Sequence, residues 1–108
     1  MLTSGWITAT IADGASITGE IDLGNHYNRV LIIMPDLDTD TSANVQVCNT
    51  SGGTFANLHN PYLATPAVIA IADAMASVVD IAGARYLKID CTTNQTGAKT
   101  ISIIAVPW

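Results

Sequence analysis

The segment AGARYLKIDC (82–91) decides the fold. From Tyr86 to Cys91, polar and apolar side chains alternate, and successive side chains of a β-strand point to opposite faces. One face carries the apolar residues Leu87, Ile89 and Cys91. The other carries Tyr86, Lys88 and Asp90. The alternation predicts a strand with one face in a core and the other toward solvent or a partner.

The rest of the chain repeats this pattern. Turn-forming residues recur about every ten residues, and short runs rich in Ile, Val, Thr and Tyr lie between them. The expected strands are 6–11, 16–23, 29–34, 44–49, 54–58, 86–91 and 100–106. This spacing is typical of antiparallel sandwiches and barrels. We therefore predict an all-β fold, an antiparallel β-sandwich of about eight short strands, forming one domain over residues 1–108.

Three expected strands carry specific predictions. In 6–11, Ile7, Ala9 and Ile11 share one face, and Trp6, Thr8 and Thr10 share the other. In 16–23, we expect Ile17, Gly19, Ile21 and Leu23 to face inward, and Ser16, Thr18, Glu20 and Asp22 to face outward. The segment 29–34 is nearly all apolar, which predicts a central strand covered on both faces.

The segment 67–79 is ambiguous. Apolar residues of the segment 66–82 fall at helical spacing, but Val68–Ile71 and Ser77–Asp80 also read as two short strands joined by a turn near Asp73. We favour two strands, because the rest of the chain is uniformly β.

Composition limits the class of protein. Of the 108 residues, 49% are hydrophobic and only 12% are charged, about half the usual charged share. The low charge suggests that other protein covers part of the surface. With four basic residues and a net charge of −5, the chain cannot form the basic cluster that nucleic acid or anionic lipid requires. Because the first residues resemble no secretory signal and no apolar run reaches the ~20 residues of a membrane helix, we expect a soluble protein made in a cytoplasm.

Arg85 and Lys88 are two of the four basic residues and lie at the start of the quoted strand and within it. We expect Lys88 and Asp90 to be solvated side chains on the outer face of the strand rather than a ligand site. We expect Arg85 to fasten a turn by binding backbone carbonyls or Asp80, rather than to bind a ligand.

The acidic segment DLDTD (36–40) places Asp36, Asp38 and Asp40 at alternate positions, as in the first half of an EF-hand loop. The Gly and Glu that this loop needs further on are replaced by Thr41 and Val47. A looser calcium site stays open, but the simpler interpretation is an acidic surface loop.

Other chemistry finds little support. His26, His59, Cys48 and Cys91 are scattered one to a segment, unlike a zinc site. We expect Cys48 and Cys91 to be free thiols, and a disulfide between them stays open if their strands are neighbours. Glu20 and Asp22 would lie side by side on an exposed face rather than across a cleft. We therefore predict no enzyme, and no catalytic, cofactor-binding or metal-binding residues.

Aromatic residues are few. Trp6 and Trp108 stand near the two ends of the chain, where we expect them to anchor the ends either to the core or to a neighbouring subunit. Tyr62 lies in an expected loop, as the single weak sign of sugar stacking.

Several stretches together resemble small structural proteins of tailed bacteriophages, over about residues 7 to 106. They are ATIADGASITGEIDLG, VLIIMP, VQVCNTSGGTFANLHN, AGARYLKID and TNQTGAKTISIIA. The chain departs from the pattern at Ile81, where an aromatic residue is expected, and in the acidic loop after Pro35, where a Trp and small residues are expected.

The resemblance implies a capsid decoration, or cement, protein with a sandwich or jelly-roll fold. It would form a homotrimer, bind the major capsid protein on the outside of the head and be made in the bacterial host cytoplasm. The rival hypothesis is a carbohydrate-binding or adhesin module of a phage fibre. A calcium-dependent enzyme subunit is a third alternative.

Overall fold

The strand predicted from residues 86–91 lies in the middle of a sheet. The computed structural model of the chain describes residues 3–38, 42–60, 67–68, 70–72 and 74–108. In it, β10 (Tyr86–Asp90) pairs antiparallel with β4 (Ser42–Cys48) on one side and with β2 (Ile21–Asp22) on the other. Leu87, Ile89 and Cys91 are fully buried, as the alternation predicts.

The described residues form strands and no helix, so this part of the chain has no helix that could cross a membrane. The other strands are β1 (Trp6–Ile11), β3 (Arg29–Ile33), β5 (Ala56–Asn57), β6 (His59–Asn60), β7 (Ala67–Val68), β8 (Ala70–Ala72), β9 (Ala76–Asp80) and β11 (Lys99–Val106).

The strands pair in a nested order. β1 pairs with β11, β2 with β10, β3 with β9 and β4 with β8, all antiparallel, and the short β6–β7 pair lies innermost in sequence. The chain therefore folds like one long hairpin whose strand pairs alternate between two sheets. One sheet has the order β1-β11-β3-β9, and the other has β2-β10-β4-β5 with β8 also on β4. This arrangement is a jelly-roll β-sandwich, which confirms the predicted fold class.

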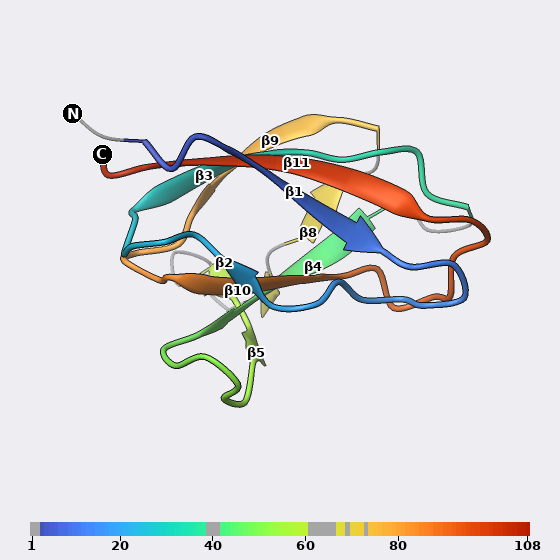
Figure 1. Cartoon of the computed structure of the whole chain (residues 1–108), viewed down its shortest axis with the longest axis horizontal. Helices are drawn as coiled ribbons and strands as arrows, with labels where there is room; N and C mark the ends of the chain where they lie inside the picture. The colour runs from blue at the N-terminus through green and yellow to red at the C-terminus, as the bar shows by residue number, and fades with distance from the viewer. Residues whose placement is uncertain (1–2, 39–41, 61–66, 69, 73) are drawn as a thin grey trace.

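The core lies between the two layers, which Figure 1 shows edge-on with β1, β3, β9 and β11 in the upper layer. The four-stranded sheet contributes Ile11, Val30, Ile32, Ile101, Ile103 and Ala105. The five-stranded sheet contributes Ile21, Ala43, Val45, Leu87 and Ile89. Most of these side chains are β-branched, which suits both a pleated strand and a close-packed interior.

The segment 16–23 departs from its predicted alternation. Only Ile21–Asp22 forms a strand, preceded by an isolated bridge between Ile17 and Asp90. Thr18, which we expected to face outward, is only 2% exposed. Its Oγ1 accepts a hydrogen bond from the Ile89 N–H (3.1 Å), and its own N–H donates to the Ile89 carbonyl (3.0 Å). A side chain thus replaces part of the backbone ladder, which draws Thr18 inward.

The segment 29–34 also departs from its prediction. β3 is central in its sheet, between β11 and β9, but only its inward face is covered. Val30 and Ile32 are fully buried, whereas Ile33 is 41% exposed. The prediction of two covered faces is therefore wrong for the isolated chain.

The described residues of the segment 67–79 form strands rather than a helix, as favoured. They make three strands rather than the two expected, because β7 pairs with β6 whereas β8 pairs with β4. The expected turn at Asp73 lies outside the described residues.

Candidate functional site

The outer side of the five-stranded sheet carries charged side chains that bind neighbouring segments. Arg85 binds Asp22 through two hydrogen bonds, Nε to Oδ1 at 2.8 Å and Nη2 to Oδ2 at 3.2 Å. Its guanidinium also lies over the Tyr86 ring, 5.2 Å from the centroid. These bonds lower the pKa of Asp22 and raise that of Arg85. The architectural role predicted for Arg85 fits this geometry, but the partner is Asp22 and not Asp80, whose Oδ1 accepts from the Ala82 N–H.

Glu20 fastens the loop between β4 and β5. Its carboxylate accepts a hydrogen bond from the Ser51 hydroxyl (2.6 Å) and one from the Gly52 N–H (2.7 Å), and these two bonds lower its pKa. The loop also folds closely on itself at Gly53. A Cβ at this position would lie only 2.6 Å from Cys48 Sγ, so a larger residue would not fit without a shift. Glu20 and Asp22 therefore each bind a different segment.

Lys88 is less solvated than predicted. Its Nζ lies 4.7 Å from the centroid of the Phe55 ring, and the side chain is half-buried. A cation held over an aromatic face is stabilised by the ring quadrupole. Lys88 therefore joins β10 to the end of the same β4–β5 loop.

An open hollow of about 370 Å³ lies between this loop and the turn before β10. Its lining residues are His26, Val47, Cys48, Asn49, Thr54, Ile81, Ala82, Gly83, Ala84 and Arg85. The turn is fixed by left-handed φ angles at Ala82 (50°) and Gly83 (89°). Nδ1 of His26 is 2.8 Å from the Gly83 carbonyl oxygen. The hollow thus has a fixed backbone and a mixed polar and apolar lining.

The acidic loop is tied to the last turn of the chain. Asp38 Oδ1 lies 2.9 Å from Lys99 Nζ, and Oδ2 accepts a hydrogen bond from the Thr96 N–H. The bond from Thr96 and then that from Lys99 lower the pKa of Asp38. Asp36 is exposed, and Asp40 lies outside the described residues. Both oxygens of Asp38 therefore already have partners.

Gln95 is a structural residue that the sequence reading missed. It is only 2% exposed, its Oε1 accepts from the Asp38 N–H (2.9 Å), and its backbone N–H donates to the Ala15 carbonyl (2.9 Å). It thus joins three loops at one end of the sandwich. It lies in the connection between β10 and β11, where its neighbours Asn94 and Thr96 are exposed.

Cys48 and Cys91 form no disulfide, and they lie at opposite ends of one strand pair. Cys48 is opposite Tyr86, five residues before Cys91, a separation of roughly 17 Å along the strand. A disulfide requires Cα atoms within about 7 Å. The two cysteines therefore cannot pair in this fold.

The two histidines contact different segments. His59 Nδ1 is 3.0 Å from the Asn57 carbonyl oxygen, and His26 borders the hollow. Within the described ranges, no three His, Cys, Asp or Glu side chains form a group that could hold a metal ion.

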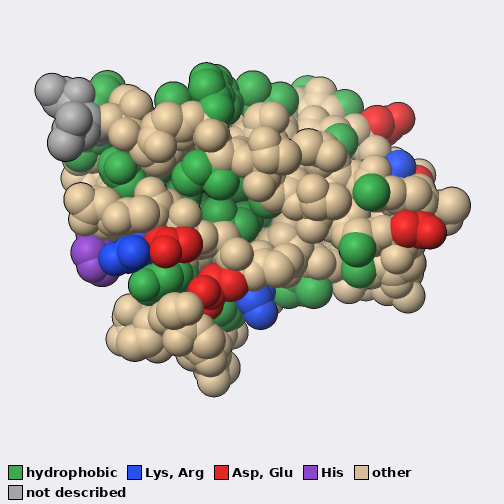
Figure 2. Space-filling model, viewed as in Figure 1, with side chains coloured by type: hydrophobic (Ala, Val, Ile, Leu, Met, Phe, Trp, Pro, Cys, Tyr) green, Lys and Arg blue, Asp and Glu red, His purple; other side chains and the backbone are tan. Residues whose placement is uncertain are grey.

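The two outer faces of the sandwich differ. Figure 2 shows charged side chains gathered over β2 and β10, and hydrophobic side chains along the margin formed by the four-stranded sheet. Trp6 is 59% exposed and Trp108 is 52% exposed, so neither anchors its chain end in the core. Tyr62 lies outside the described residues.

Comparison with known proteins shows a shared fold. The chain is similar to the SPBc2 prophage-derived protein YomS, with a TM-score of 0.60 over 97% of this chain and 95% of that one, at 16% sequence identity. No protein-family model matches the chain, and a search of the curated proteins gave no significant match. The likeness to YomS extends to the jelly-roll fold alone.

Proposed function

We propose that this chain is a structural virion protein of a tailed bacteriophage, which binds the outside of the head as a decoration protein and stabilises capsid subunit junctions. The observation that carries the proposal is the jelly roll shared with a prophage-derived protein over 97% of the chain. The sequence motifs quoted above, which resemble those of decoration proteins, support it independently.

The docking surface that we propose is the rim of the hollow, formed by the β4–β5 loop and the turn before β10. Glu20 holds the loop through Ser51 and Gly52, and Asp22 holds Arg85 beside the turn. A surface ordered before binding loses less conformational entropy on docking. Asn49 and Thr54 are exposed on this rim and offer hydrogen-bonding groups to the major capsid protein.

Stabilisation would arise from many weak contacts acting together. A homotrimer presents its docking surface three times, and capsid subunits in one shell hold the contact points at high effective concentration. The protein would then need no catalytic group, and its role would be non-enzymatic.

The test is to mix the purified protein with undecorated heads of the same phage and image them by electron cryomicroscopy. We expect density at regular lattice positions. Thr54→Arg, on the rim of the hollow, should reduce occupancy at least tenfold. Thr100→Arg, at an exposed position on the other sheet, is the matched control and should bind like the wild type. Absence of wild-type density on the heads would refute the decoration role.

The alternative is a carbohydrate-binding module. The described residues that line the hollow include no Trp, Tyr or Phe, which sugar sites use for stacking. A glycan array, run with and without calcium, separates the two functions, since a decoration protein should bind no glycan.

A further inference from the structure

The outer face of the four-stranded sheet carries an unbroken apolar row across all four strands. Trp6 on β1 is opposite Ile104 on β11, Ile104 is opposite Leu31 on β3, and Leu31 is opposite Val78 on β9. Ile33 and Val106 flank the row on the same side of the sheet. We call these residues the apolar face: Trp6, Leu31, Ile33, Val78, Ile104 and Val106.

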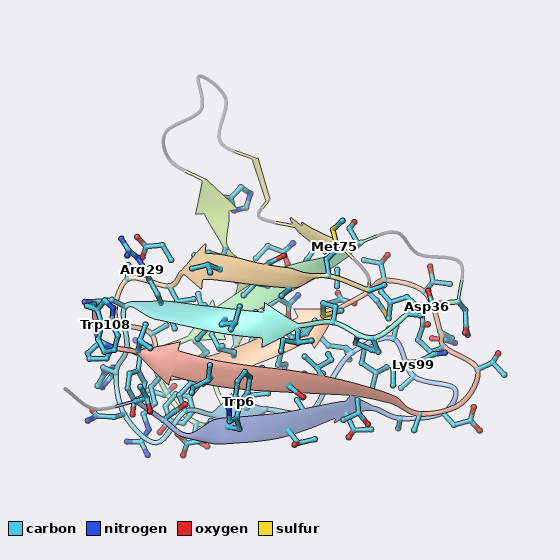
Figure 3. The ribbon with its side chains drawn as sticks, turned by 90° about the horizontal axis from the view of Figure 1, so that it is seen from above. Trp6, Arg29, Asp36, Met75, Lys99 and Trp108 are labelled. Atoms are coloured by element: carbon cyan, nitrogen blue, oxygen red, sulfur yellow. The ribbon has the colours of Figure 1, made fainter. Side chains whose placement is uncertain are left out.

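Among the described residues of this face, Trp6, Ile33 and Val78 are exposed, and Leu31, Ile104 and Val106 are half-buried. Val78 is 70% exposed, and Trp6 in the same row is also mostly exposed. Figure 3 looks onto the sheet and shows Trp6 lying between β1 and β11, with Trp108 at one end of the face. Both tryptophans of the chain therefore lie on or beside it.

The apolar face is also electrically balanced. The outward positions of its four strands include two charged residues, Arg29 and Asp80, which have opposite sign and are cross-strand neighbours at one end. The whole chain carries a formal net charge of −5, so the excess of negative charge lies on the other surfaces. The apolar face therefore opposes a second copy with no net charge of its own.

The exposed area suits contact between copies. Trp6 and Trp108 together leave on the order of 200 Å² uncovered, and the aliphatic side chains of the face add roughly as much again. A standard interface buries about 800 Å² on each partner, of which about 65% is apolar in homodimers. The face and the adjoining Trp108 therefore supply together most of the apolar area that a homo-oligomeric interface contains.

We propose that the apolar face is the surface through which copies of this chain associate with one another. This proposal concerns the free protein and does not depend on the decoration role. A protein with few charges and two exposed tryptophans would aggregate before meeting any other partner unless this face were covered, and a second copy is always present.

The test is the mass of the purified protein by light scattering. We expect the wild type to be a defined oligomer at micromolar concentration. Val78→Glu places a charge at the β9 end of the row, at a side chain that is mostly exposed in the monomer, and should yield monomers. Thr100→Glu puts the same charge at the exposed far end of the same sheet and should leave the oligomer intact. A monomeric wild type, or a Val78→Glu protein that remains as oligomeric as the control, would overturn the proposal.

Tryptophan fluorescence gives a second readout that needs no variant. Since both tryptophans lie on or beside the apolar face, dilution of the wild type through its dissociation range should shift the emission to longer wavelength. An oligomer that dissociates with unchanged emission would place the interface elsewhere. Neither measurement involves heads, so failure here is separate from failure of the decoration role.

Discussion

The guanidinium of Arg85 donates two hydrogen bonds to the carboxylate of Asp22, a residue 63 positions earlier in the chain. The pair lies between β2 and the turn that precedes β10. It therefore fixes the short edge strand β2 against the hollow, and Arg85 stabilises architecture at the border of the proposed docking surface.

Replacement of Arg85 by Met should lower the melting temperature by only a few degrees, because both partners are partly exposed and water screens their attraction. Arg85→Lys should not fully restore it, since an ammonium group cannot form the two parallel bonds. Thermal unfolding followed by circular dichroism measures this. Arg29→Met is the control, because Arg29 forms no ion pair with any described residue. An equal loss in the control would mean that the bonds to Asp22 contribute nothing specific.

The sequence predicts the strands better than it predicts what holds their ends. Alternation along Trp6–Ile11 and Tyr86–Asp90 specifies the inward faces correctly, because one buried face imposes period two on the residues. The partner of Arg85 is not predictable in this way, since Asp22 and Asp80 are equally suitable acceptors until the fold brings one of them close. The side-chain contacts on the outer face of a sheet therefore become known only from the three-dimensional structure.

The buried position of Thr18 is likewise not predictable from the alternation of the sequence. A threonine between Ile17 and Gly19 fits the outward positions of an alternating strand, and nothing local reveals that its hydroxyl accepts a bond from Ile89. Thr18→Val keeps the shape but leaves the Ile89 N–H buried without its acceptor. We expect a loss of about 1–3 kcal/mol of unfolding free energy, measured by urea denaturation.

The control for that experiment is Thr8→Val, at an exposed position of β1. A valine there has the same β-propensity gain without the buried bond, so stability should hold or rise slightly. If Thr18→Val were as stable as the wild type, the bond to Ile89 would be absent in solution.

Gln95 should be among the polar residues most sensitive to substitution. Its Oε1 accepts from the Asp38 N–H and its Nε2 donates to the Thr93 carbonyl (2.9 Å), so Gln95→Leu leaves both groups without this partner. Because Gln95 is buried whereas Asp38 and Thr93 are exposed, water can replace part of the lost bonds, and we expect a loss of about 1–3 kcal/mol of unfolding free energy. Asn94→Leu, at the exposed neighbouring position, should change stability little when measured by the same denaturation. Equal effects of the two variants would show that Gln95 is not a structural centre of these loops.

Acid should destabilise the fold through Glu20, Asp22 and Asp38. Hydrogen bonds in the folded state lower the pKa of each carboxyl below its value in the unfolded chain, which is about 4. The ionised forms therefore stabilise the fold fully above about pH 5, and this stabilisation is lost as the pH falls through the lowered pKa values. We expect the unfolding free energy to fall steadily between about pH 5 and pH 2.

Glu20→Gln tests the origin of that dependence. A neutral amide can still accept from Ser51 or Gly52 but does not titrate, so the variant should be less stable than the wild type at pH 7 and lose less on acidification. Asp36→Asn is the control, because the Asp36 carboxylate accepts no hydrogen bond from any described residue. Urea denaturation at several pH values supplies the slopes. If Glu20→Gln kept the full wild-type slope, the bonds to the β4–β5 loop would not be formed in solution, and the ordered rim proposed for capsid docking would lose its physical basis.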